Sequence, residues 1–184
     1  EKVEVPAEWA AIEVKAAETK VDSSRPDFVK NIVDPINALK GDLLPVSAFL
    51  GREDGTWDNG TAAYEKRGVA VDVPEWIPEN CIQCNQCAYV CPHATIRPFA
   101  MSKAEADAAP ASTKKVQMKG KGCEEYVFTM AVSPLDCMGC GVCVNVCPAK
   151  EKALVMKGQE SQLPQQEVFD YAVKEVSVKE LPFK

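Results

Sequence analysis

Apolar and polar residues form a clear strand-like pattern in the second half of the chain. Apolar side chains alternate from Tyr126 to Val132, which predicts a β-strand. Upstream, Ser102 and Glu105 have the spacing of a capping box, and an alanine-rich stretch follows until Pro110. The sequence therefore predicts a short solvated helix over residues 102–109, followed by a polar, mobile loop over residues 111–122.

The two ends of the chain show weaker patterns. Within residues 1–70, prolines and glycines break up the apolar positions, and Asp34-Pro35 suits the start of a helix of about six residues ending at Gly41. We expect residues 1–70 to be an irregular leader that wraps and packs on a neighbouring domain. Residues 157–184 carry a modest apolar stripe that includes Val168 and Ala172, which fits either a terminal helix or a connector; we assign them as a C-terminal connector.

Composition narrows the possible functions. The chain has 184 residues, 46% of them apolar, with a net charge of −6, which is too apolar and too balanced for intrinsic disorder. No basic cluster supports nucleic-acid binding, and no apolar run is long enough to span a membrane. No signal peptide opens the chain, and a first residue of Glu1 suggests a processed protein or a piece of a longer one.

Eight of the nine cysteines form two copies of one pattern. Each copy has the spacing C-x2-C-x2-C-x3-C-P, and the two copies are offset by 56 residues. The cysteines are Cys81, Cys84, Cys87 and Cys91 in the first run, and Cys137, Cys140, Cys143 and Cys147 in the second run. Such a pair is an internal repeat, and it makes a metal centre the main candidate function.

This spacing is typical of two [4Fe–4S] clusters with crossed ligation. Three thiolates within seven residues can each bind a different iron of one cube, whereas the helix that follows carries the fourth cysteine to the other cluster. Cluster A would therefore take Cys81, Cys84, Cys87 and Cys147. Cluster B would take Cys137, Cys140, Cys143 and Cys91. With eight thiolates and two oxidised cores, the loaded chain would carry a charge of about −10, so we expect low reduction potentials.

Other readings of the cysteines explain less. A disulfide framework suits small secreted proteins, and a thioredoxin-like site needs a single C-x-x-C pair. Zinc would leave the third cysteine of each run and the following x3-Cys-Pro step unexplained. The ninth cysteine, Cys123, has no partner at cluster spacing and fits a small buried thiol. His93, the single histidine, could influence cluster B but more often such a residue is solvated.

Residues beside the cysteines fit the same interpretation. Pro92 and Pro148 would help to end each short helix, and Gly139 and Gly141 would let the second loop approach sulfur closely. The expected fold is α+β: a βαβ repeat like that of two-cluster bacterial ferredoxins, over residues 71–156, with an insertion at about residues 101–125. The irregular leader over residues 1–70 and the connector over residues 157–184 flank this domain.

Three stretches resemble a known enzyme family. They are the run YEKRGVAVDVPEWIPENC at residues 64–81, continuing to CPHATIRP at 91–98; the run DPINALKGDLLPVSAF at 34–49; and SPLDCMGCGVC at 133–143. Together they closely resemble the two-cluster domain of pyruvate:ferredoxin (flavodoxin) oxidoreductases and the segment leading into it. The resemblance spans about residues 30–156.

The resemblance implies more than the residues do. Members of that family are cytoplasmic homodimers that use thiamine diphosphate, coenzyme A and a third cluster, all held in regions missing from this chain. The chain would then relay single electrons from the thiamine site to an external ferredoxin or flavodoxin, with the remaining domains as partners. A free-standing two-cluster carrier and a domain whose clusters only hold the fold are the alternatives. We find no catalytic motif in the chain itself.

Overall fold

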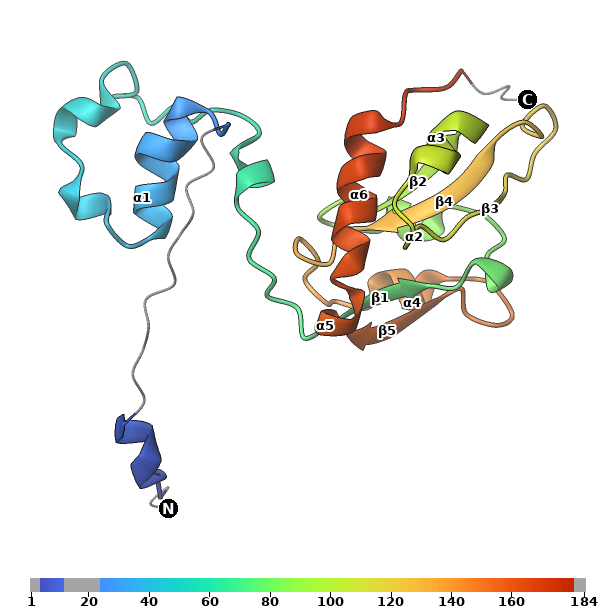
Figure 1. The fold of residues 1–184 in the computed structure, drawn as a ribbon, viewed down its shortest axis with the longest axis horizontal. Coiled ribbons are helices and arrows are strands. Elements are labelled where there is room, and N and C mark those ends of the chain that lie inside the picture. The colour runs from blue at the N-terminus through green and yellow to red at the C-terminus, as the bar shows by residue number, and fades with distance from the viewer. Residues whose placement is uncertain (1–3, 12–23, 181–184) are drawn as a thin grey trace. The chain divides into compact units, whose positions relative to one another are not determined.

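The computed structural model describes residues 4–11 and 24–180, which fall into two compact units (Figure 1). The first unit is Glu1–Glu65 and the second is Lys66–Lys184. All eight repeat cysteines belong to the second unit. No helix in the described parts of either unit is long and apolar enough to cross a membrane.

The second unit contains two antiparallel sheets. Strand β1 (Asp72–Trp76) pairs with β5 (Leu154–Gly158), so the first and last strands of the unit lie side by side. Strand β4 (Val127–Val132) lies between β2 (Ile96–Met101) and the short β3 (Val116–Gln117). The first sheet thus joins the strand before the first cysteine run to the strand after the second run. In the second sheet, the strand after the first run pairs with the strand before the second run.

Each cysteine run contributes one short helix between two strands. Helix α2 (Gln86–Tyr89) lies between β1 and β2, and α4 (Val142–Val146) lies between β4 and β5. The one-turn 3-10 helix Pro78–Asn80 precedes the first run. The order strand, loop, helix, strand therefore occurs twice. The segment between β2 and β4 holds helix α3 (Lys103–Ala108) and β3.

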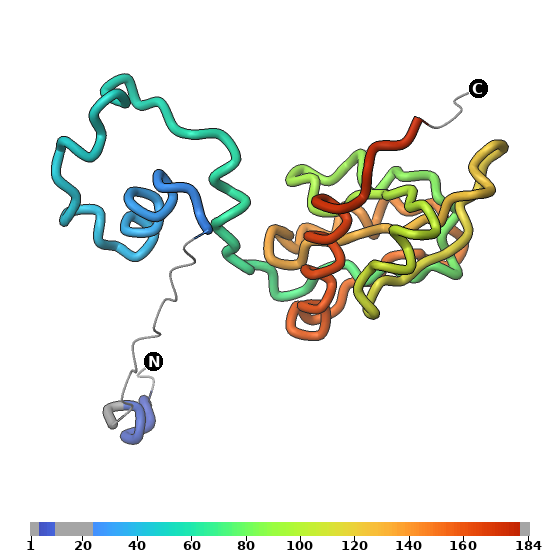
Figure 2. Tube along the Cα trace, turned by 45° about the horizontal axis from the view of Figure 1, so that its top comes forward, coloured from blue at the N-terminus to red at the C-terminus, as the bar shows by residue number. Residues whose placement is uncertain are grey.

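Strand β4 is buried on both faces. Its side chains Phe128, Met130 and Val132 pack with Trp76, Ile96, Cys143 and Leu154 in the main core, against which several other cysteines also pack. On the opposite face, Ala131 packs against Val168, Phe169 and Ala172 of helix α6 (Pro164–Glu175). Helix α6 follows the short helix α5 (Gln159–Gln162) and lies beside β4 in both views (Figures 1 and 2). Because both faces are covered, β4 is apolar almost throughout.

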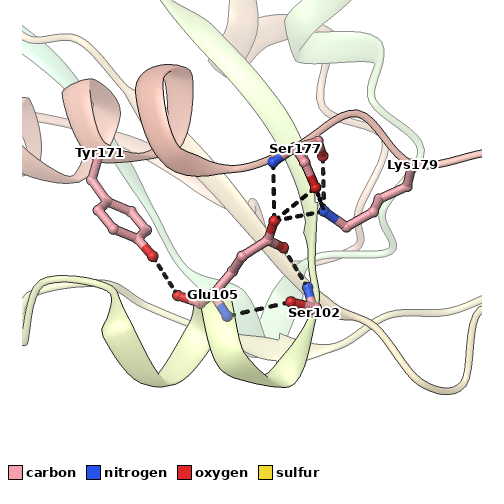
Figure 3. A network of polar contacts seen from close by, with 5 residues as sticks. All are labelled: Ser102, Glu105, Tyr171, Ser177 and Lys179. Atoms are coloured by element: carbon pink, nitrogen blue, oxygen red, sulfur yellow. Dashed lines mark hydrogen bonds and ion pairs between the residues drawn. The ribbon is translucent and has the colours of Figure 1, made fainter.

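The chain beyond α6 is attached to helix α3 through one carboxylate (Figure 3). Oε1 of Glu105 accepts hydrogen bonds from the N–H (3.0 Å) and hydroxyl (2.9 Å) of Ser177, and it forms a 2.8 Å ion pair with Lys179. Oε2 accepts the N–H of Ser102 at 2.7 Å, which completes the capping box. The hydroxyl of Tyr171 donates to the carbonyl of Glu105 at 2.7 Å. The inserted helix therefore holds the C-terminal segment.

The first unit has a small core and a large exposed apolar surface. A helical stretch runs through a π-helical segment (Val29–Val33) into α1 (Asp34–Asn37), and short 3-10 helices follow it at Gly41–Leu43, Val46–Phe49 and Thr61–Tyr64. A further 3-10 helix covers Ala7–Ala11. Phe28 packs edge-on to Trp57 at 4.9 Å, with the Arg52 guanidinium 4.0 Å from the Phe28 centroid. In contrast, Leu39 is 95% exposed and Val46 is 91% exposed.

Two local predictions are confirmed. The structure has the capping box of Ser102 and Glu105 at the start of α3, and it has strand β4 where apolar residues alternate. The polar loop expected over residues 111–122 also contains β3, which pairs with β4 through Val116↔Phe128 and Gln117↔Val127. The C-terminal stripe forms helix α6, with Val168 and Ala172 buried.

The α-helix predicted at Asp34 and Pro35 is present as α1, but it continues a longer helical stretch and does not begin one. The helical stretch begins at residue 27, and Pro35 lies inside it. A proline inside an α-helix lacks the N–H and collides with the carbonyl four residues before it. Here the preceding turn is wider, because the N–H of Asp34 bonds to the carbonyl of Val29, five residues back. Burial of Val29, Ile32 and Val33 on one face explains why the helix extends past the proline signal.

We expect Glu105→Gln to destabilise the second unit at neutral pH by about 1–2 kcal/mol, since a charged acceptor with several donors is lost. The pKa of Glu105 lies below its usual 4.5: burial raises it, but the bonds from Lys179, Ser177 and Ser102 outweigh burial. Because the pKa of Glu105 is lowered in the folded state, its carboxylate contributes its full stabilisation above pH 4.5. This contribution to the free energy of unfolding is lost as the pH falls through the folded-state pKa.

Urea unfolding at pH 7 and at pH 4 tests this prediction. The difference between wild type and Glu105→Gln should shrink at the lower pH. Glu167→Gln is the matched control, because Glu167 is an exposed residue in the first turn of α6 and should leave stability unchanged. An equal loss in both variants would contradict the role given to Glu105.

Candidate iron–sulfur centres

Two cavities lie among the cysteines, and each is bordered by four of them. Cavity A is lined by Cys81, Cys84, Cys87 and Cys147, and cavity B by Cys91, Cys137, Cys140 and Cys143. Their empty volumes are similar, about 390 Å³ for cavity B and about 330 Å³ for cavity A. In each cavity, three cysteines come from one run and the fourth is the last cysteine of the other run.

The short helices produce this exchange of cysteines. Helix α2 begins after Cys84 and carries the chain to Cys91, and α4 does the same between Cys140 and Cys147. Helices α2 and α4 are in contact with each other, so the end of each helix lies near the loop of the other run. The last cysteine of each run therefore lines the cavity opposite its own loop.

The two cysteine loops share an unusual backbone conformation. Gln83 and Asn85 in the first loop have φ values of 60° and 59°, and Gly139 and Gly141, which lie 56 residues later, have values of 69° and 71°. The N–H groups of Gln83 and Gly139 each donate to the sulfur of the cysteine two residues before, at 3.4 Å. The glycines thus adopt the expected left-handed conformation, and the first loop adopts it without glycine.

Burial affects the ionisation of several of these thiols. It raises the pKa of Cys87 to about 12 and that of Cys143 to about 11, and it also raises the pKa of Cys137. Cys91 differs, because hydrogen bonds from the hydroxyl and N–H of Thr95 outweigh its burial and hold its pKa below the usual value. Buried thiols of this kind become thiolates when bound cations compensate their charge, as iron does.

The cavities fit iron–sulfur clusters better than single metal ions. In the described residues, no three side chains of His, Cys, Asp or Glu converge on a position for one ion, and the described cysteines form no disulfide. Cavity A is also lined by Trp76 and Asn85, whose Nε1 and Oδ1 are buried without a hydrogen-bond partner in the described part of the chain. The indole N–H can only donate, so it needs an acceptor such as cluster sulfur.

The other candidate residues lie at the edges of this arrangement. His93 lines cavity B but its side chain is exposed, while Cys123 is buried and lines neither cavity. Two exposed lysines donate to backbone carbonyls of cysteines that line cavity A: Lys119 to the carbonyl of Cys81 at 3.1 Å, and Lys152 to the carbonyl of Cys147 at 2.7 Å.

The sequence patterns do not point to Thr95 or Trp76 as part of the site. The hydroxyl of Thr95 lies 3.4 Å from the sulfur of Cys91, and Trp76 belongs to β1, ahead of the first cysteine. The two runs differ at the fourth residue after the last cysteine, where the first has Thr95 and the second has Glu151. This difference between the repeats is a weak signal for Thr95. Nothing in the spacing of cysteines points to Trp76.

Comparison with known proteins relates the chain to a family. Residues 80–151 match a family described as a 4Fe-4S dicluster domain, and residues 14–70 match one described as a domain of unknown function. A pyruvate-flavodoxin oxidoreductase of Klebsiella pneumoniae is 49% identical over 183 residues, covering 100% of this chain. A pyruvate:ferredoxin oxidoreductase of Moorella thermoacetica is 51% identical over 156 residues, covering 85% of this chain.

The resemblance to pyruvate:ferredoxin (flavodoxin) oxidoreductases is confirmed. A mitochondrial pyruvate dehydrogenase [NADP(+)] of Euglena gracilis is similar as well, 42% identical over 95% of this chain. The chain spans 15% of the Klebsiella protein, 13% of the Moorella protein and 9% of the Euglena protein. It therefore corresponds to a domain-sized part of these oxidoreductases.

Gly139 and Gly141 allow a matched test of the second loop. A Cβ at Gly139 would lie 2.9 Å from the carbonyl oxygen of Asp72, whereas at Gly141 no atom lies within 4 Å. We expect Gly141→Ala to cost about 1–2 kcal/mol, from the left-handed backbone alone. Gly139→Ala should cost more, because it must also displace the backbone at the start of β1. Thermal unfolding and iron content check this order, and equal losses in the two variants would contradict it.

Proposed function

We propose that this chain is the electron-transfer domain of a pyruvate:ferredoxin oxidoreductase. The observation that supports this most is the composition of the two cavities, each lined by three cysteines of one run and the last cysteine of the other. Under this proposal, Cys81, Cys84, Cys87 and Cys147 ligate cluster A, and Cys137, Cys140, Cys143 and Cys91 ligate cluster B. The two βαβ halves are then copies of one unit, with an insertion between them.

The residues of this chain have defined tasks in that role. Bound iron–sulfur clusters supply reversible one-electron chemistry. The cysteine thiolates hold them, and the N–H groups of Gln83 and Gly139 donate to ligand sulfurs and so favour the reduced state. Phe128, Met130 and Val132 on β4 limit access of water to the centre of the unit. Cys84 and Cys140 are exposed, so both cavities reach the surface where electrons can enter or leave.

The oxidoreductase activity belongs to the complete enzyme. The chain spans 15% of the pyruvate-flavodoxin oxidoreductase of Klebsiella, so most of such an enzyme lies elsewhere. We place the thiamine diphosphate, coenzyme A and a third cluster in that remainder, in a homodimer that delivers electrons to an external ferredoxin or flavodoxin. The exposed apolar side chains of the first unit, such as Leu39 and Val46, suit packing against those other domains.

Exchange of the last cysteines can be tested by substitution. Cys147→Ala should damage cluster A, held by the loop of residues 81–87, although Cys147 belongs to the second run. Cys91→Ala should damage cluster B. Iron and acid-labile sulfide analysis should give about eight of each per wild-type chain, and electron paramagnetic resonance of the reduced protein should distinguish the two clusters. Loss of cluster B in Cys147→Ala would contradict the assignment.

The proposal assigns electron transfer to this chain and pyruvate chemistry to the rest of the enzyme, which gives a second expectation. The purified chain, once loaded with clusters, should accept electrons from a strong chemical reductant but should not consume pyruvate when thiamine diphosphate and coenzyme A are supplied. Visible absorption follows the first property, and coenzyme A-dependent loss of pyruvate measures the second. Pyruvate turnover by this chain alone would show that it is more than an electron-transfer domain.

A further inference from the structure

Thr95 brings a buried hydroxyl to one of the cysteines that line cavity B. It lies directly before β2 and is 3% exposed. Its hydroxyl lies 3.4 Å from the sulfur of Cys91, and its N–H donates to the same sulfur at 3.3 Å. One residue therefore supplies both a side-chain and a backbone hydrogen bond to a sulfur of cavity B.

The backbone donors around the two cavities largely match, but this hydroxyl does not. Gln83 and Gly139 donate to Cys81 and Cys137, and their positions differ by the repeat offset of 56 residues. In contrast, the residue equivalent to Thr95 is the exposed Glu151, and the lining of cavity A in the described residues contains no Ser, Thr or Tyr.

A hydroxyl in this position favours the reduced state of the group it contacts. A metal-bound thiolate can only accept a hydrogen bond, so the hydroxyl must be the donor. One-electron reduction makes the cluster and its sulfurs more negative, which strengthens that bond. Burial acts in the opposite direction, because Cys137 and Cys143 are buried and added charge is poorly solvated there. Lys119 and Lys152 beside cavity A are exposed, so solvent and salt screen their effect.

We propose that the Thr95 hydroxyl raises the reduction potential of cluster B and thereby offsets the burial of its cysteines. Thr95 is a positioning residue that acts through Cys91, and the described lining of cavity A contains no hydroxyl. This inference rests on the cluster assignment of the proposed function. The Trp76 indole N–H is a side-chain donor at cavity A, so the Thr95 hydroxyl sets one part of the difference between the two potentials.

Thr95→Val tests the proposal on the complete protein. Valine keeps the branched shape and both backbone hydrogen bonds of Thr95 but removes the hydroxyl. In a redox titration followed by electron paramagnetic resonance, each cluster takes one electron from an added low-potential reductant, such as a reduced viologen, with no bond made or broken. We expect the equilibrium constant for reducing cluster B to fall about tenfold, a shift of about 59 mV. Cluster A should be unchanged.

Two further variants serve as controls. Thr95→Ser keeps a hydroxyl, so the reduction potential of its cluster B should lie close to that of the wild-type protein. Thr129→Val removes another buried hydroxyl, which donates to the carbonyl of Lys114 at 2.8 Å, not to a sulfur, and should leave both potentials unchanged. If valine prevents assembly of cluster B, Thr95→Ala replaces it.

Several outcomes would overturn the proposal. These are an unchanged cluster B in Thr95→Val, an equal shift of both clusters, a serine variant that behaves like valine, or loss of cluster B in every variant lacking the hydroxyl, which would make Thr95 an assembly residue. Failure of the proposed function is recognised separately. It would appear as missing iron and sulfide in the wild-type protein, or as the wrong cluster lost in Cys147→Ala.

Discussion

The exchange of one cysteine between two loops is the constraint on which the second unit depends. Neither run can surround a cavity by itself, since the fourth cysteine of each lies beyond a helix that leads to the other loop. The pairing of β1 with β5 and of β2 with β4 keeps these two halves together. Under the proposed cluster assignment, binding of clusters and folding of the unit would be coupled, because the four cysteines of each set come together when both halves are in place.

The core around the cavities serves the same constraint. The side chains of β4 alternate between the main core, where Met130 lines cavity A, and the face covered by α6, so this strand links the site to α6. Polar atoms in this core are mostly satisfied, and two of the three exceptions in the described residues belong to Trp76 and Asn85 in the lining of cavity A. The Trp76 N–H is a donor that a ligand with acceptors would satisfy, whereas Asn85 Oδ1 is itself an acceptor and needs a donor.

Cysteine spacing predicted the two sets of four that line cavities A and B, and ligation of clusters by these sets stays a prediction. The capping box of α3 and the alternation of β4 were equally readable, because they are local signals. The start of the first helix was not, since burial of Val29, Ile32 and Val33 outweighs the local preference of Pro35. Left-handed Gln83 and Asn85 also escaped prediction, because side chains rarely adopt this conformation unless tertiary contacts impose it.

Thr95, Trp76 and the partners of Glu105 share another property that hides them in a sequence. Each of them either contacts residues that are distant along the chain or depends on a group whose position cannot be inferred from residue spacing alone. Glu105 carries a signal for its capping role, yet Ser177 and Lys179 lie more than 70 positions later. Their roles follow from the way the strands bring separate segments together, which requires the folded structure.

The contact of the C-terminal segment with α3 has a consequence for how such domains recombine. Helix α3 supplies no cysteine to either cavity, yet it holds the segment after α6 through Ser177 and Lys179. A core grafted into another protein without α3 would keep every thiol but lose the contacts that fix this segment. Exchange of the unit between enzymes, by evolution or by engineering, would therefore have to move α3 and the segment after α6 as a pair.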